Sequence, residues 1–316
     1  MATLHDEYRS PLSTRYAGLP LRQLFSEQTR IRTWRRLWIW LAEAQAELGL
    51  DIQPAQIEAM ERARDEIDFE KAAAYEARFR HDVMAHVHTF GDAAPEARGV
   101  IHLGATSCFV TDNAEAVLLR EGLQQIAVSL AEAIDALGAF AAAHRGTACL
   151  GYTHFQPAQP TTMGKRATLW IQDLLADLVA VERVAAEVPF RGAKGTTGTQ
   201  ASYLALFEGD EEKVRALDRK VAERAGFPRS VPVTGQTYPR KADYTIVSAL
   251  GGIAISATRI ANDIRLLSSL RELAEPFEKE QIGSSAMAYK QNPMRSERVT
   301  SLARHLMALV PEAGAM

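Results

Sequence analysis

The feature that most constrains the fold of this chain is the spacing of apolar residues in three long stretches. In the first stretch they recur at alternating intervals of four and three residues, at Leu119, Leu123, Ile126, Leu130, Ala133, Leu137 and Phe140. The same alternation runs through residues 171–188 and 246–267. Such spacing keeps one face of an α-helix turned toward neighbours that run nearly parallel to it. Strand patterns are nearly absent, so the sequence predicts an all-α protein built around an elongated bundle of long helices.

The segments between these stretches are rich in Gly, Pro and polar residues. Residues 146–160 contain too many Pro and Gly for a helix, which predicts a long loop or a short hairpin, with Pro160 near the next helix start. Loops are also predicted at 191–199, 230–239 and 271–294. Polar residues that packing does not require tend to carry function when they lie on such loops.

Two domains are expected. Residues 1–107 predict a small N-terminal domain of shorter helices, and residues 108–316 predict the long-helix bundle. Thr111, Asp112 and Asn113 offer capping side chains at the start of its first long helix.

The bundle predicted from this sequence is incomplete. Another amphipathic helix begins near Ser296, and the sequence ends at Met316. The three periodic stretches and this last helix expose more apolar surface than they cover. We therefore expect either that other subunits complete the bundle or that a C-terminal part is missing.

Charge and cysteine content exclude several classes of protein. The 316 residues contain 36 Lys and Arg against 39 Asp and Glu, a formal charge of −3, so no basic excess attracts the chain to nucleic acid or an anionic membrane. Cys108 and Cys149 are too few for a disulfide framework. We find no signal-peptide stretch at the start and no apolar run approaching about 18 residues. These features predict a soluble, cytoplasmic protein.

Several histidines are candidates for chemistry. The run from Arg80 to His88 contains three histidines, but it has no His-Glu-x-x-His pattern, so a metal site is not expected. We expect His86 and His88 to be buried and hydrogen-bonded. His154 lies in a Pro-stiffened loop, where it could act as a general acid or base or simply satisfy loop backbone groups.

The most specific feature is the segment from Gly283 to Lys290. Its glycine and two serines allow backbone N–H groups to turn toward one anion, and residues 284–304 contain four cations and one acid. A solvated loop and a Ser-Lys nucleophile pair are alternatives, although the segment lacks Ser-x-x-Lys and Gly-x-Ser-x-Gly. Residues 192–199 resemble a phosphate cradle without the Gly-Lys-Ser/Thr ending of a P-loop, and no Gly-x-Gly-x-x-Gly follows a strand, so NTPase and dinucleotide folds are not expected.

Six motifs, in order, resemble one known family. The segment from Gly283 to Pro293 is similar to the signature loop of the fumarase/aspartase superfamily, and its continuation through Arg298 resembles the adenylosuccinate lyases, most closely their animal-type branch. The other motifs begin at Arg80, Ile101, Thr153, Lys194 and Thr234. The similarity runs from about Tyr8 to Val310.

The resemblance implies a fold, an assembly and a reaction. It implies an all-helical homotetramer with a common central bundle, composite active sites and no metal or organic cofactor. The implied reaction is β-elimination of fumarate from adenylosuccinate, giving AMP, and from the succinylated aminoimidazole carboxamide ribotide of purine biosynthesis. Family members continue well past Val310, so the resemblance also implies that this chain is C-terminally truncated.

The resemblance also implies residue roles. Ser284, in the signature loop at 281–293, matches the general base, and His154 matches the general acid. The positions that match substrate-binding residues are Arg15, Tyr16, Arg80, His81, Asp82, Thr106, Ser107, Gln236, Lys290, Asn292 and Arg298, with His102 a weaker candidate.

Two residues of the loop depart from the family pattern, since the family commonly has Pro at Ala288 and Arg at Gln291. Two alternative hypotheses for the function are another lyase of the superfamily, similar to argininosuccinate lyase, and a non-catalytic oligomerising fragment.

Overall fold

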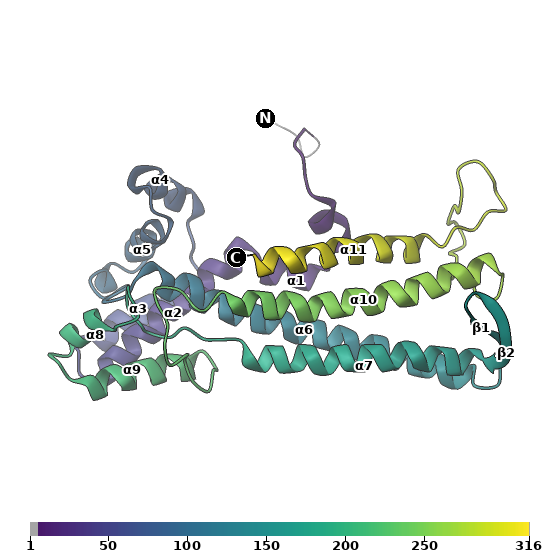
Figure 1. Ribbon diagram of the computed structural model, residues 1–316. Helices are drawn as coiled ribbons and strands as arrows, with labels where there is room; N and C mark the ends of the chain where they lie inside the picture. The colour runs from purple at the N-terminus through teal and green to yellow at the C-terminus, as the bar shows by residue number, and fades with distance from the viewer. Residues whose placement is uncertain (1–5, 316) are drawn as a thin grey trace. The chain divides into compact units, whose positions relative to one another are not determined.

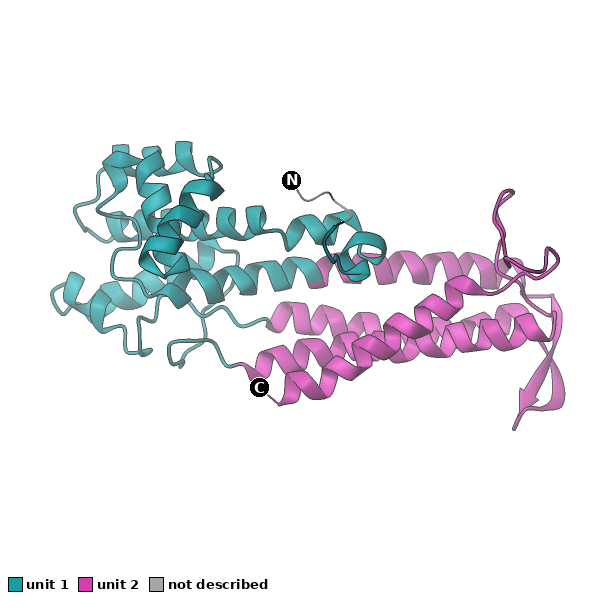
Figure 2. Cartoon of the chain, turned by 90° about the horizontal axis from the view of Figure 1, so that it is seen from above, with its two compact units in different colours: residues 1–122, 188–239 teal, residues 123–187, 240–316 magenta. Residues whose placement is uncertain are grey.

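The computed structural model of the chain describes residues 6–315 (Figure 1). The chain forms two compact units (Figure 2). Unit 1 contains the residues up to Gly122 together with Val188–Pro239, and unit 2 contains Leu123–Glu187 and the residues from Arg240 onward. Residues 188–239 thus cluster with the N-terminal helices, an association that the sequence pattern does not indicate.

Unit 1 is built from short helices around α2. In chain order its elements are the π-helix η1 (Leu12–Tyr16), α1 (Leu19–Leu24), α2 (Glu27–Glu47), α3 (Pro54–Ala63), α4 (Phe69–Phe79), α5 (Asp82–Ala93), the 3₁₀-helix η2 (Pro95–Ala97), the start of α6 (Ser107–Ala143), α8 (Ala201–Leu206) and α9 (Glu211–Arg224). Side-chain oxygens cap the N-termini of several helices. Ser26 accepts from Thr29 N at 3.2 Å at the start of α2, and Asp68 and Asp210 cap α4 and α9 in the same way.

The core of unit 1 contains a charged residue. Trp38, Phe90 and Arg35 are all fully buried, and the Arg35 guanidinium lies 4.5 Å from the centre of the Phe90 ring. Arg35 donates to the carbonyls of Ala63 and Glu66. Burial lowers the pKa of Arg35 to about 10, although nearby acidic side chains oppose this shift.

Unit 2 contains the long helices. Its elements are the rest of α6 (Ser107–Ala143), the strands β1 (Ala148–Thr153) and β2 (Gln156–Thr162), α7 (Met163–Glu187), α10 (Lys241–Ser269) and α11 (Met294–Gly314). Helix α10 packs against α7 and α11, and Trp170 in α7 donates to Asp263 in α10 at 2.8 Å. The predicted all-α bundle is confirmed. The predicted short hairpin is confirmed as the antiparallel pair β1–β2.

Apolar side chains remain exposed on the long helices. Val128, Val179 and Ile255 are each more than half exposed. By length and composition α6 and α10 also pass a test for membrane-spanning helices, with 11% and 28% of their most apolar windows buried. These helices are not uninterrupted apolar runs, since charged residues such as Glu132 in α6 and Arg259 in α10 interrupt them, so the prediction that no apolar run approaches about 18 residues is not contradicted. Core helices of soluble proteins pass the same test.

Two local predictions are wrong. Helix α6 begins at Ser107, so Thr111, Asp112 and Asn113 lie inside it and do not cap it. Asp112 and Asn113 are buried, and they bond instead to loops distant in sequence. Pro160 lies within β2 and α7 starts after it, at Met163, because the hairpin pairing extends to Thr162.

Candidate active site

In unit 1 the start of α5 lies beside the start of α6. Arg80 ends α4 in the left-handed region at φ 55°, and His81 then caps α5 by accepting from Met84 N at 3.3 Å through Nδ1. The other ring nitrogen, Nε2, lies 3.4 Å from Ser107 Oγ. With Nδ1 accepting, the neutral ring carries its proton on Nε2, which faces Ser107.

The loop that carries Gln236 reaches the same place. Gln236 donates through Nε2 to Thr106 Oγ1 at 3.3 Å. Unit 1 therefore brings together four predicted substrate-binding residues in two pairs, His81 with Ser107 and Gln236 with the adjacent Thr106.

Contacts on both sides hold the Gln236 loop in place. Before it, Gly198 approaches the Thr234 carbonyl so closely that an added Cβ would lie 1.7 Å from that oxygen. After it, Tyr238 N donates to Asp112 Oδ2 at 2.7 Å. The Gln236 side chain therefore projects from a backbone segment that is fixed at both ends.

Beneath these loops lies a set of buried charges that sequence reasoning missed. Arg191 has no exposed surface and donates to the Gly195 carbonyl at 2.5 Å. Lys194 donates to Asp218 Oδ2 at 2.6 Å, and Asp218 Oδ1 accepts from Ala193 N at 2.8 Å. The lysine of the predicted cradle-like loop is thus paired inside the protein and is not free to hold a phosphate. Asp218 follows Val214 and Leu217 on the buried face of α9, and an acid on an apolar face was the available signal.

In unit 2, His154 lies at the tip of the β1–β2 hairpin. His154 and Phe155 form its two-residue turn with φ of 51° and 58°, values that glycine and asparagine adopt far more readily. Both side chains are exposed, Phe155 to 82%. A strained turn that presents an exposed histidine is consistent with a functional role for that side chain.

Glu272 ties this hairpin to the segment that precedes the signature loop. Tyr152 in β1 donates to Glu272 at 3.1 Å, and Arg166 in α7 lies 3.5 Å from the same carboxylate. Arg166 also donates to the Leu150 carbonyl at 2.6 Å. In both overall views the hairpin and the loop between α10 and α11 lie at the same end of the long helices (Figures 1 and 2).

The signature loop folds its backbone around Ser284. Ser284 Oγ accepts from the backbone nitrogens of Ala286 and Met287 at 3.4 and 3.3 Å. Gly283 packs against the Lys290 carbonyl, where an added Cβ would lie 2.3 Å from the oxygen, so the two ends of the segment 283–290 meet. Two N–H groups that face one oxygen stabilise negative charge on it.

The other predicted residues have less definite surroundings. Arg15, Arg80, Asp82 and Arg298 are exposed, as is Tyr16 at 38%, and Asp82 Oδ1 lies 3.6 Å from His81 Nδ1. Asn292 lines a cavity of about 560 Å³ beside the signature loop.

His102 and His86 belong to the core of unit 1. His102 Nδ1 accepts from Trp38 Nε1 at 2.8 Å, and burial lowers the pKa of His102 to about 4. His86 is buried as expected, but within the described part of the chain its Nδ1 has no hydrogen-bond partner, so that half of the prediction is wrong. His88 is partly exposed and lies against the rings of Tyr75 and Phe79.

Curated proteins similar to this chain are named adenylosuccinate lyases. The protein of Saccharomyces cerevisiae is 54% identical over 98% of this chain and 65% of its own length. That of Schistosoma mansoni is 55% identical over 96% of this chain and 63% of its own length, and that of Pyrococcus horikoshii is 31% identical over 95% and 66%. The chain spans just under two thirds of the length of these relatives.

Solved structures share the fold. A 3-carboxy-cis,cis-muconate lactonizing enzyme from Pseudomonas putida superposes with a TM-score of 0.81 at 24% identity, covering 95% of this chain and 66% of that one. A fumarate lyase from Mesorhizobium sp. BNC1 superposes with a TM-score of 0.76 at 25% identity, covering 92% and 64%. A family model described as Lyase matches residues 20–308. This chain therefore belongs to that lyase family.

Proposed function

We propose that this protein is a lyase that eliminates fumarate from adenylosuccinate to give AMP, and from the succinylated aminoimidazole carboxamide ribotide of purine biosynthesis. The observation that carries the proposal is the pair of backbone N–H groups aimed at Ser284 Oγ in a loop that also contains Lys290. The names of curated relatives that are 54% and 55% identical to this chain indicate the substrate.

β-Elimination requires a base, an acid and stabilisation of a carbanion-like intermediate. Ser284 acts as the base: its alkoxide, stabilised by the N–H groups of Ala286 and Met287 and by Lys290, removes a proton from the carbon next to a carboxylate. The electron pair of that C–H bond forms the new double bond, and the C–N bond breaks. His154 donates a proton to the departing nitrogen, a contribution worth about 10²–10⁴ in rate.

The remaining predicted residues bind the substrate in this proposal. Arginines suit the phosphate and the succinyl carboxylates through bidentate hydrogen bonds. In unit 1 the substrate-binding residues are Arg15, Tyr16, Arg80, His81, Asp82, Thr106, Ser107 and Gln236, and in unit 2 they are Asn292 and Arg298. The chemistry needs no metal or organic cofactor.

The assembly is a homotetramer with composite active sites, in the soluble cytoplasm. The exposed apolar side chains of α6, α7 and α10 support this proposal, because copies of the same helices would bury them. The division into domains at 1–107 and 108–316, with the signature loop at 281–293, stays a prediction, because it divides the chain by sequence position and the two units are defined by contacts.

The test is turnover of adenylosuccinate by the purified chain, followed as fumarate release, with argininosuccinate as the competing substrate. We expect release from adenylosuccinate that is lost in Ser284→Ala. Release from argininosuccinate alone would assign the chain to another lyase of the superfamily. Binding of adenylosuccinate without release from either substrate would show a non-catalytic protein.

A further inference from the structure

The carboxylate of Glu275 joins the segment before the signature loop to the helix after it. Glu275 Oε1 accepts from Ser296 N at 2.7 Å and from Ser296 Oγ at 2.6 Å, and Oε2 accepts from Arg295 N at 3.1 Å. Ser296 is buried at 6% exposed, and Glu275 is half-buried. Three hydrogen bonds therefore cross the base of the loop.

These bonds supply a cap that α11 lacks locally. Its N-cap residue is Pro293, which provides no side-chain hydrogen bond, so the first N–H groups of the helix need an acceptor from elsewhere. The Glu275 carboxylate accepts hydrogen bonds from two of these N–H groups, those of Arg295 and Ser296. Its negative charge is also favourable at a helix N-terminus.

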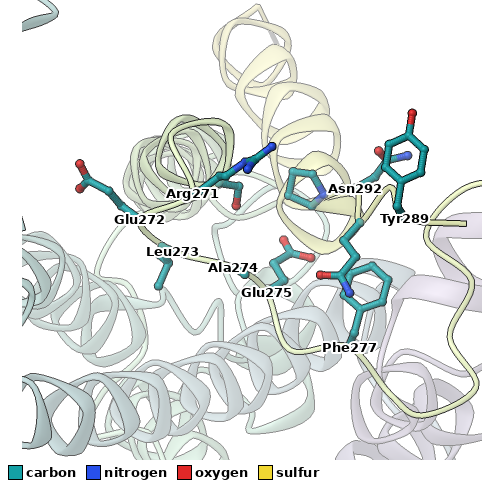
Figure 3. A pocket seen from close by; sticks show the side chains of 11 residues that line it. Arg271, Glu272, Leu273, Ala274, Glu275, Phe277, Tyr289 and Asn292 are labelled. Carbon is teal, nitrogen blue, oxygen red and sulfur yellow. The ribbon is translucent and has the colours of Figure 1, made fainter. Parts of the chain in front are cut away.

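The base of the loop is close to the proposed chemistry. Gly283 packs against the Lys290 carbonyl, and the Phe277 ring lies next to Gly283, so the two ends of the segment 283–290 meet beside Phe277. In Figure 3, Glu275 and Phe277 lie below Tyr289 and Asn292 among the side chains that line the cavity. We therefore expect a shift of the segment at Glu275 relative to α11 to move the ends of the segment 283–290, which carries Ser284 and Lys290.

We propose that Glu275 is a positioning residue for the reaction, holding the base of the signature loop closed so that the N–H groups of Ala286 and Met287 stay aimed at Ser284 Oγ. The expected effect of Glu275 on the reaction rate rests on the proposed function. Its expected effect on the structure of the signature loop does not. It assigns no contact between Glu275 and the substrate.

Amide hydrogen exchange tests the structural consequence. In Glu275→Ala the amides of Arg295 and Ser296 lose their acceptor and exchange faster in any case. The proposal also expects faster exchange, by about tenfold or more, at Ala286, Met287 and Lys290, whose own bonding partners are untouched. Faster exchange confined to Arg295 and Ser296 would overturn the proposal, because it would show a local helix cap and nothing more.

Glu278→Ala is the matched control. Glu278 is an exposed carboxylate of the same segment and pairs with the Arg295 side chain at 3.0 Å, but it accepts from no backbone N–H of α11. We expect its exchange pattern at Ala286, Met287 and Lys290 to match that of the unsubstituted chain. Equal loss of protection in both variants would overturn the specific role of Glu275.

Kinetics test the functional consequence. We expect Glu275→Ala to lower kcat for adenylosuccinate by roughly 10- to 100-fold, since misplacement of reacting groups by about 1 Å costs that much, with KM changed less than about threefold. Glu275→Gln keeps an acceptor oxygen without the charge and should restore part of kcat. An unchanged kcat in Glu275→Ala would overturn the proposal.

The two measurements separate this inference from the proposed function. If the unsubstituted chain releases no fumarate while Glu275→Ala still exposes the amides of Ala286, Met287 and Lys290, the proposed function fails and the positioning role stands. If fumarate release is normal and those amides stay protected in Glu275→Ala, the positioning role fails and the proposed function stands.

Discussion

Lys194 Nζ lies 2.6 Å from Asp218 Oδ2, and the two side chains are only 8% and 11% exposed. Asp218 also accepts from Ala193 N and from Ser230 Oγ. One carboxylate therefore joins the loop at 191–199, helix α9 and the loop at 230–239. The last of these loops carries Gln236.

Removing one partner of this pair should be costly. Lys194→Met leaves Asp218 buried and negatively charged without its ion-pair partner, which should lower the free energy of unfolding by about 3–5 kcal/mol. Urea denaturation measures the loss. Lys220→Met is the control, because Lys220 pairs with Glu47 at the surface, with side chains 36% and 46% exposed, and should change stability by less than about 1 kcal/mol. Equal losses in the two variants would contradict this account.

Substitution of Gly198 and of Gly209 distinguishes the cost of backbone strain from the cost of a steric clash. Gly198 has φ +81° and its Cβ would lie 1.7 Å from the Thr234 carbonyl oxygen, whereas Gly209 has φ +89° and nothing within 4 Å of its Cβ position. Gly209→Ala should therefore cost about 1–2 kcal/mol, the price of the left-handed backbone alone. Gly198→Ala should cost clearly more and should raise KM for adenylosuccinate, because Thr234 must move and Gln236 moves with it. Similar stability and KM in both variants would show that the two loops do not interlock.

Acid should destabilise the native state through buried histidines. Burial, with positive charge on Arg35 and Arg30 outweighing Asp82, lowers the pKa of His86 from 6.5 to about 4. Between those pH values the unfolded chain binds a proton that the native state refuses, so stability falls as pH decreases. The loss amounts to roughly 3 kcal/mol by pH 4, and His102, whose pKa is also about 4, adds to it.

Urea denaturation at pH 7 and pH 4.5 measures this slope, which is the decrease in the free energy of unfolding as the pH falls. His86→Phe should reduce it, since the ring keeps its contacts with Trp34 and Phe69 but has no proton to bind. His305→Gln, at an exposed position of α11, should leave it unchanged. A slope that survives in His86→Phe would mean that other groups cause the acid sensitivity.

The acid and base of the proposed mechanism can be separated from binding. His154→Ala and Ser284→Ala should each abolish elimination, with a loss of at least about 10² in kcat, and should leave the affinity for AMP within a few fold. Calorimetric titration with AMP and fumarate release provide the two measurements. Near-normal rates in both variants would show that the roles are assigned to the wrong residues.

Much of the fold was predictable because helical periodicity is a local property. The alternating spacing of four and three predicts α6, α7 and α10, and the Pro- and Gly-rich run after α6 predicts the β1–β2 hairpin. The same local reasoning was wrong for Asp112 and Asn113. Their residue types favour helix caps, but in the folded chain their side chains bond to Tyr238 and Gly192, which are 126 and 79 residues away in sequence.

The candidate site also contains residues that the sequence predicted and residues that it did not. The resemblance to a known family marked His81, Ser107, Gln236, His154 and Ser284, and the last three also stand in polar loops that packing does not require. No motif marked Arg191 or Glu275, since their partners are backbone groups whose positions depend on how distant segments fold.

The sequence by itself determined the helical class, the family and the loops that carry the polar residues, because periodicity and motifs are written in neighbouring positions. Only the tertiary structure decided that Lys194 is buried against Asp218, that two backbone N–H groups face Ser284 Oγ, and that Glu275 caps α11. The physical reason is that burial and hydrogen-bond geometry depend on residues that meet only after folding, and these determine which charged groups are paired and which remain available for chemistry.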